Sequence, residues 1–265
     1  MSTLEPPTSR RGHLRDFRLA EGQAPSWYRQ SLLKNALAAL APVYFVALAA
    51  HVGFAAWLET GAASVVVASL ALLAMFALVI RALPGHGHLR FGPANIITAI
   101  RAAMVSFFGS AVLFGAGASD PVALVAIVAI ALAMDGVDGY FARRTGLISP
   151  LGTRFDMEVD AFLILLLSLA ALLIGKAGWW VLLIGLMRYG FVLGQAFLPF
   201  LNAPLPPSFR RKLICVVQVA ALCVILLPIV APPASTAVAA TALGLIVYSF
   251  GVDVIDLARR RHLSP

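Results

Sequence analysis

Eight long apolar stretches alternate with short polar segments along the chain. They lie near residues 36–58, 62–82, 95–115, 121–141, 157–175, 177–200, 212–231 and 235–256. Each is close to the roughly 20 residues that an α-helix needs to cross the hydrocarbon core of a bilayer. The apolar residues run continuously and do not alternate with polar ones, which excludes a membrane β-barrel. The pattern predicts an all-α integral membrane protein with about eight transmembrane helices.

The composition agrees with a membrane protein. Of the 265 residues, 61% are hydrophobic and 12% are charged, whereas soluble domains carry about 25% charged residues. A soluble enzyme, a disordered chain and a disulfide-rich scaffold are therefore excluded. The net charge of +8 is interpreted as a signal of membrane orientation and of contact with anionic lipid, and we expect no nucleic-acid partner.

The positive charges indicate one orientation. With the N-terminus in the cytoplasm, eight spans place 18 of the 20 Lys and Arg residues at the cytoplasmic face. Lys176 falls on the far side and Arg188 falls within a span. We therefore expect both termini to be cytoplasmic, in a multi-pass protein of a bacterial inner membrane. Residues 10–34 either lie on the anionic leaflet as an interfacial helix or form a solvated basic tail.

Acidic residues are concentrated where the fourth predicted helix ends and the fifth begins. Five of the 12 acids fall within 26 positions, namely Asp135, Asp138, Asp156, Glu158 and Asp160. The first two are three residues apart, and Asp156 and Asp160 are four apart, so each pair shares one helix face. Ionisable groups at membrane depth are costly and indicate function. Four carboxylates that converge between two helices suit Mg²⁺ or Mn²⁺ and suffice for two ions.

Small residues and one arginine lie between the two acidic pairs. Gly136, Gly139 and Ala142 would let a ligand approach the helix backbone, and Arg143 could pair with a phosphate. Together with metal-binding acids, these features favour phosphoryl transfer near the cytoplasmic membrane surface. Intramembrane acids also mark ion pathways, so an ion-coupled transporter is the alternative from another class of protein.

The stretch from Asp135 to Asp160 resembles the signature of the CDP-alcohol phosphotransferase (CDP-alcohol phosphatidyltransferase) family, D-x2-D-G-x2-A-R-x8-G-x3-D-x3-D. All eight defining positions are present at that spacing: Asp135, Asp138, Gly139, Ala142, Arg143, Gly152, Asp156 and Asp160. The resemblance implies a homodimer with a six-helix catalytic core, here residues 91–256. It leaves 1–35 as a cytoplasmic basic segment, 36–90 as two additional transmembrane helices and 257–265 as a basic tail.

The resemblance also implies the reaction and the roles of the signature residues. The enzyme would transfer the phosphatidyl group of a CDP-linked lipid, such as CDP-diacylglycerol, to the hydroxyl of a polar alcohol and release CMP. Asp135, Asp138 and Asp156 would be metal ligands, and Asp160 would be a ligand or the general base. Arg143 would brace the phosphates as a catalytic residue. The other residues lining the nucleotide and diphosphate site would be Gly139, Ala142 and Gly152.

A shorter motif lies at the start of the third predicted helix. Asn95-Ile-Ile-Thr98-Ala-Ile-Arg101 resembles the family's N-x-x-T-x-x-R. In the family this motif commonly follows a proline, whereas Ala94 separates Pro93 from Asn95 here. Asn95 and Thr98 would contact the nucleotide. Alternatively, Asn95 would only cap the helix that starts after Pro93.

Several positive charges could select the acceptor alcohol. Phosphatidylglycerophosphate synthases often carry Lys or Arg directly after the last signature acid, where this chain has Ala161. The candidates for binding an acceptor phosphate are Arg154, Arg188, Arg210, Arg211 and Lys212. Arg188 has no adjacent acid, so it either binds the acceptor or pairs with a carboxylate elsewhere in the fold. We favour glycerol 3-phosphate over inositol phosphate, serine or another head group.

Acids outside the signature are expected to have structural roles. Glu158 is turned away from the signature acids and is expected to be a salt-bridge or loop partner. At the end of the last predicted helix, Asp253 and Asp256 are expected to pair with Arg259 and Arg260.

Overall fold

The computed structural model describes residues 26–83, 91–116, 120–145, 149–203, 205 and 208–263. Within these ranges the chain forms eight α-helices of 16 residues or more and no strand. They are α1 (Ser26–Trp57), α2 (Gly61–Ala82), α3 (Pro93–Leu113), α5 (Pro121–Thr145), α6 (Pro150–Leu173), α7 (Leu182–Phe197), α8 (Phe209–Leu226) and α9 (Ala234–Leu263). Two short 3-10 helices, η2 (Trp179–Val181) and η3 (Pro199–Asn202), flank α7. The predicted all-α class is confirmed.

Five of these helices are long and apolar enough to cross a membrane: α1, α2, α3, α7 with η2, and α9. The helices α6 and α8 are also 24 and 18 residues long, but each carries a cluster of charges near its N-terminus. The described apolar part of α5 is shorter, Pro121–Asp135, because the acidic signature occupies the rest of that helix. The protein is therefore a multi-pass helical membrane protein whose charges gather at the ends of a few helices.

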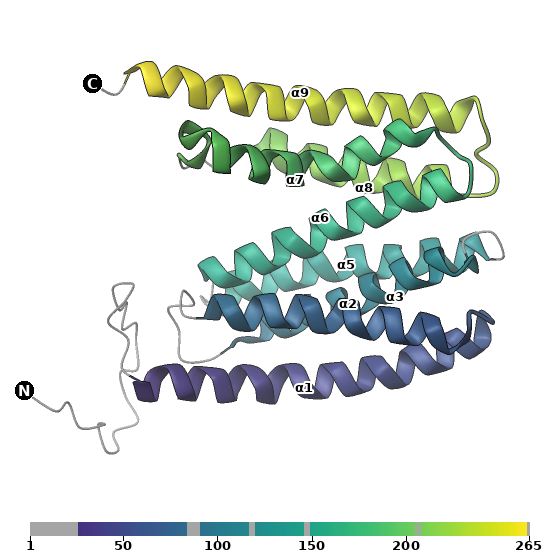
Figure 1. The fold of residues 1–265 in the computed structure, drawn as a ribbon, viewed down its shortest axis with the longest axis vertical. Helices are drawn as coiled ribbons and strands as arrows, with labels where there is room; N and C mark the ends of the chain where they lie inside the picture. The colour runs from purple at the N-terminus through teal and green to yellow at the C-terminus, as the bar shows by residue number, and fades with distance from the viewer. Residues whose placement is uncertain are drawn as a thin grey trace, which may run out of the picture.

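The helices run back and forth in one bundle, and the start of α1 and the end of α9 lie at the same end of it (Figure 1). At the centre is α3, which packs against α1, α2, α5 and α6. Of its 21 residues, 14 are buried. The helices α6, α7, α8 and α9 form the other half of the bundle and pack on one another. The site described below lies where the two halves meet.

Several helix boundaries differ from the hydropathy prediction, among them the start of α6, which is Pro150 and not residue 157. The helix α1 begins at Ser26, ten residues before the predicted start at 36, and α9 continues to Leu263, beyond the predicted end at 256. The early part of α1 is polar on average but buries Leu32 in the bundle, so a search for continuous apolar runs misses it. The predicted interfacial or solvated segment 10–34 falls mostly in residues 1–25, which lie outside the described residues.

The helices α6 and α7 approach each other closely at Gly185. A Cβ atom at this position would lie 2.4 Å from the Cα and 2.9 Å from the backbone nitrogen of Leu165. Small residues permit such contacts between membrane helices. A flexible side chain could rotate away from an added methyl group, but the backbone of α6 could not.

We therefore expect Gly185→Ala to destabilise the protein by about 1–3 kcal/mol through overpacking. The measurement is the thermal unfolding midpoint of the purified protein in detergent. Gly190→Ala is the matched control on the same helix, because a Cβ there would meet no atom within 4 Å. An equal midpoint for both variants would show that the close contact at Gly185 contributes nothing.

Candidate active site

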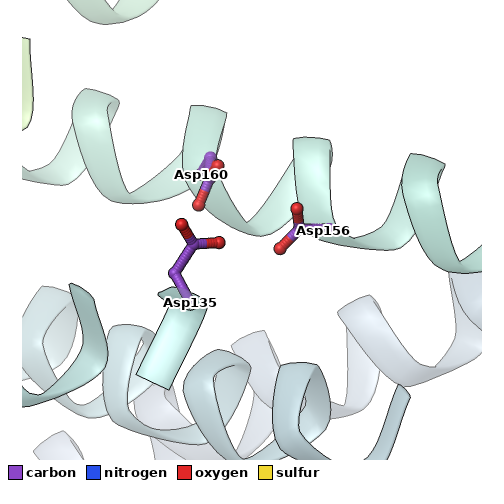
Figure 2. A group of neighbouring side chains, drawn as sticks. All are labelled: Asp135, Asp156 and Asp160. Carbon is purple, nitrogen blue, oxygen red and sulfur yellow. The ribbon is translucent and has the colours of Figure 1, made fainter. Parts of the chain in front are cut away.

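Three carboxylates from two helices point toward one another between α5 and α6 (Figure 2). Asp135 comes from α5, and Asp156 and Asp160 come from successive turns of α6. Each offers one oxygen, and the three oxygens all lie within 4.8 Å of one another. Their side chains are 34%, 35% and 27% exposed, so the cluster is partly open. We refer to Asp135, Asp156 and Asp160 as the acid trio.

The start of α6 determines where its two acids point. Ser149 caps the helix, since its Oγ accepts a hydrogen bond of 3.0 Å from the backbone N–H of Gly152. Pro150 follows at the first helical position, where its missing N–H costs nothing. Phe155 and Val159 are buried and hold the helix against its neighbours. Residues 156 and 160 are four apart and share one helix face, and this face meets Asp135 of α5.

A buried guanidinium joins the acid trio. Arg101 of α3 has a side chain that is 1% exposed. Its Nη1 lies 2.5 Å from Oδ1 of Asp156 and 3.0 Å from Oδ1 of Asp135. Its Nη2 lies 2.5 Å from Oδ1 of Asp160. The side chain therefore links three helices through one charged group.

Asn95 and Thr98 lie on the same helix as Arg101 and are also buried. Nδ2 of Asn95 donates to the carbonyl of Phe91, and Oγ1 of Thr98 donates to the carbonyl of Ala94 at 3.1 Å. Gly92, and not Asn95, occupies the N-cap position of α3. Asn95 is therefore not the N-cap residue of α3, and its contact with the nucleotide stays a prediction.

Gly152 allows α6 to approach this part of α3. A Cβ atom at Gly152 would lie 2.6 Å from Oδ1 of Asn95 and 3.2 Å from Oγ of Ser149. The glycine of the long motif and the asparagine of the short motif are thus in contact. A larger residue at 152 would displace the Asn95 amide or open the gap between the two helices.

The first turns of α8 lie beside the acid trio. The thiol of Cys215 is within electrostatic range of Asp160, Asp135 and Asp156, and α8 packs against both α5 and α6. Arg211 precedes Cys215 by four residues, so it lies on the same face of α8, one turn nearer the helix start. The cationic start of α8 is therefore about one helical turn, roughly 5 Å along the helix, from Cys215.

Two of these cations pair with an acid of α9. Nη2 of Arg210 lies 2.5 Å and Nη1 of Arg211 lies 3.2 Å from Oδ1 of Asp253. The Asp253 side chain is only 7% exposed, because it faces α8 and not solvent. The prediction that Asp253 pairs with basic residues of its own helix is therefore wrong.

The mid-helix arginine of α7 also has a carboxylate partner. Nη2 of Arg188 lies 2.5 Å from Oε1 of Glu158, and the two side chains are 26% and 50% exposed. The salt bridge predicted for Glu158 is confirmed. Of the two alternatives for Arg188, the structure contains the pair with a carboxylate. Arg154 and Lys212, the remaining acceptor candidates, have exposed side chains.

Several signature residues are not described beyond their place in α5. These are Asp138, Gly139, Ala142 and Arg143, whose side chains lie outside the described part of the structure. Their predicted roles in metal and nucleotide binding stay predictions. The sequence alone assigns no site role to Arg101, which is one of the charges at the cytoplasmic face and the last residue of the short motif. A charged residue within an otherwise apolar helix is the signal that points to it.

Comparison with known proteins places this arrangement in a family. Residues 91–252 match the CDP-alcohol phosphatidyltransferase family. Two relatives are each named "Probable phosphatidylglycerophosphate synthase", from Mycobacterium tuberculosis strains CDC 1551 / Oshkosh and ATCC 25618 / H37Rv. Each is 32% identical over 171 residues, which cover 63% of this chain and 81% of the relative. No solved structure matches the chain significantly. The matched region contains the acid trio and Arg101, and the chain belongs to the CDP-alcohol phosphatidyltransferase family.

Proposed function

We propose that the protein transfers the phosphatidyl group of CDP-diacylglycerol to glycerol 3-phosphate, forming phosphatidylglycerol phosphate and CMP. Family membership makes it a CDP-alcohol phosphatidyltransferase and sets aside the transporter alternative. The observation that carries the proposal is the convergence of Asp135, Asp156 and Asp160 from two helices of the matched region. The choice of acceptor is supported by the name that both relatives carry.

The reaction needs a base and a way to stabilise charge on phosphate. The acceptor hydroxyl attacks the β-phosphorus of the CDP-lipid. As the new P–O bond forms, the bond from that phosphorus to the bridging oxygen breaks, and CMP leaves with the oxygen and the bond's electrons. The hydroxyl proton passes to the base. Asp160 suits that role, because its carboxylate is partly exposed to an incoming acceptor and is oriented by Arg101.

The acid trio fits a divalent cation. Three carboxylate oxygens within 4.8 Å of one another are hard donors of the kind that Mg²⁺ and Mn²⁺ prefer. We propose that Asp135, Asp156 and Asp160, with Asp138 of the signature, hold two such ions. When bound, the ions would neutralise the diphosphate and the charge that develops on the departing CMP.

The nucleotide is proposed to bind over the α3–α6 contact. Asn95 and Gly152 meet there, and Thr98 is buried about one turn further along α3. The family signature adds Gly139, Ala142 and Arg143 of α5, with Arg143 bracing the diphosphate. The close approach of Gly152 to Asn95 supports this placement, because the two motifs that resemble the family's nucleotide-binding residues come together in space.

The acceptor phosphate is proposed to bind at the start of α8. Arg211 lies one turn from Cys215, which is within electrostatic range of the acid trio, and the exposed Lys212 follows it. A cationic helix start beside the carboxylates would hold the phosphate of glycerol 3-phosphate while its hydroxyl meets Asp160. Arg188 pairs with Glu158 at 2.5 Å, whereas Arg211 contacts Asp253 at the longer distance of 3.2 Å, so the proposal uses Arg211 and not Arg188.

The membrane orientation is inferred from the pattern of charges, and the assembly is inferred from the family resemblance. The start of α6, the start of α8 and the end of α9 carry basic residues at the end of the bundle that holds the site. An excess of Lys and Arg marks the cytoplasmic face. We propose that the site and both termini face the cytoplasm and that the protein is a homodimer, as the family resemblance implies.

The acceptor is identified by a product assay. The purified protein is placed in nanodiscs containing CDP-dioleoylglycerol and Mn²⁺ and is incubated with glycerol 3-phosphate, inositol phosphate or serine. The lipid products are identified and quantified by mass spectrometry. We expect phosphatidylglycerol phosphate to form at least about tenfold faster than any other product, a discrimination of about 1.4 kcal/mol. A faster product from another alcohol would contradict the assignment of the acceptor while leaving the reaction class intact.

A further inference from the structure

Arg101 stands out among the charged side chains that the structure describes. It lies eight residues after the first residue of α3, about 12 Å along the helix, and its side chain is 1% exposed. An arginine remains charged in any protein environment. A permanent positive charge at this depth is costly unless carboxylates surround it, and the acid trio supplies them.

The guanidinium uses the same oxygen atoms that a metal ion would use. Nη1 contacts Oδ1 of Asp156 and Oδ1 of Asp135, and Nη2 contacts Oδ1 of Asp160, at 2.5–3.0 Å. The group therefore fills the gap between the three carboxylates. A divalent ion binds carboxylate oxygens at about 2.0–2.2 Å. An ion at that distance from all three oxygens would take the place of the guanidinium and would repel its charge.

The charge balance explains why such a group is needed. Three carboxylates whose oxygens lie within 4.8 Å repel one another, and each disfavours ionisation of the others. Without a cation, the segments of α5 and α6 that carry these acids would repel each other. The planar guanidinium of Arg101 contacts both helices at once. The ammonium group of a lysine, which is a point charge on a flexible side chain, would do this less well.

We propose that Arg101 is a built-in counter-ion that holds the acid trio together in the metal-free protein and that divalent metal must displace. Arg101 is a positioning residue, and its competition for the carboxylate oxygens lowers the affinity of the site for metal. The inference rests on the proposed metal-dependent function, to which it adds competition between an internal cation and the cofactor. The metal site would then be pre-assembled and folded before metal arrives, and metal would exchange more readily.

The test measures Mn²⁺ affinity directly and does not use turnover. Full-length wild-type protein and Arg101→Met in nanodiscs are titrated with Mn²⁺, and free Mn²⁺ is followed by electron paramagnetic resonance. We expect the Mn²⁺ Kd of Arg101→Met to fall at least about tenfold. We also expect its thermal midpoint to fall in EDTA and to recover with Mn²⁺. A merely structural arginine would give the opposite change, because misplaced ligands bind metal more weakly.

Two further variants complete the test. Arg188→Met removes a guanidinium that pairs with Glu158 and does not contact the acid trio, so the Mn²⁺ Kd of this variant should match that of wild type. If its Kd falls as much as that of Arg101→Met, the effect is one of overall charge and the inference is overturned. Arg101→Lys keeps the positive charge but loses the two-pronged guanidinium. It replaces Arg101→Met in the test if that variant does not fold. We expect the Kd of Arg101→Lys to fall several-fold.

The outcomes separate the inference from the proposed function. An unchanged or higher Mn²⁺ Kd in the Arg101 variants, with normal binding by wild type, overturns the inference alone. If wild type and variants all fail to bind Mn²⁺, both the inference and the proposed metal dependence are contradicted. If affinities change as expected but no CMP is released with any acceptor, the inference holds and the proposed reaction fails.

Discussion

Asp160→Asn is expected to lower kcat for phosphatidyl transfer by about 10²- to 10⁴-fold, the range typical of losing a general base, with little change in affinity for the CDP-lipid. Asparagine has the shape of aspartate but cannot take the acceptor's proton. Its carbonyl oxygen can still accept the hydrogen bond that Oδ1 of Asp160 receives from Arg101 at 2.5 Å. The measurements are kcat from CMP release and Kd from titration with CDP-dioleoylglycerol.

Glu158→Gln is the matched control for this experiment. Glu158 precedes Asp160 by two residues on α6, but it pairs with Arg188 and does not belong to the acid trio. Removing its charge should leave kcat close to wild type. If Asp160→Asn instead loses the CDP-lipid, metal binding is the essential role of Asp160 and proton transfer is not. If Asp160→Asn keeps full turnover, neither role is correct.

Asp156→Ala is expected to remove most of the metal dependence and most of the activity. The substitution deletes one of the three carboxylates whose oxygens lie within 4.8 Å, and it deletes the partner 2.5 Å from Nη1 of Arg101. Charge on the diphosphate would then be poorly stabilised, and we expect CMP release to fall on the order of 10²- to 10³-fold. The measurement is the rate of CMP release and the amount of bound Mn²⁺ across a Mn²⁺ titration.

The reason for the large effect is that excess metal cannot replace a missing ligand. Wild-type protein stripped with EDTA should regain its activity when Mn²⁺ is added, whereas Asp156→Ala should stay inactive at saturating Mn²⁺. Normal Mn²⁺ binding together with a normal rate in Asp156→Ala would contradict the assignment of the acid trio as the metal site.

Hydropathy was sufficient to predict the helices, but it was not sufficient to predict their ends. A bilayer requires runs of apolar residues, and eight such runs correspond to the eight long helices of the described residues. Helix ends outside the apolar core are held by contacts such as the burial of Leu32 near the start of α1. Because these contacts depend on tertiary packing, the first helix was predicted ten residues too short.

The acidic site was predictable because charge is rare in this chain. Asp135, Asp156 and Asp160 were conspicuous by their spacing, and a short connection between their helices favours an antiparallel pair. The local pattern does not specify which cation neutralises them. Arg101 is 55 residues from Asp156, and only the central position of α3 brings it to the acids.

The same limit explains the wrong pairing predicted for Asp253. Spacing along one helix suggested partners in α9, but Asp253 faces α8 and binds Arg210 and Arg211. Local sequence determines which residues share a helix face, whereas the neighbour that each face meets depends on how the helices pack. Contacts between distant helices therefore came only from the structure.

The most direct test of the central claim is CMP release by the purified protein, measured with and without an acceptor alcohol. The protein is placed in nanodiscs with CDP-dioleoylglycerol and Mn²⁺, and CMP is quantified as glycerol 3-phosphate is added. We expect CMP to appear only when both acceptor and divalent metal are present, with one phosphatidyl product formed for each CMP. No CMP with any acceptor, or CMP released at the same rate without one, would contradict phosphatidyl transfer at the acid trio.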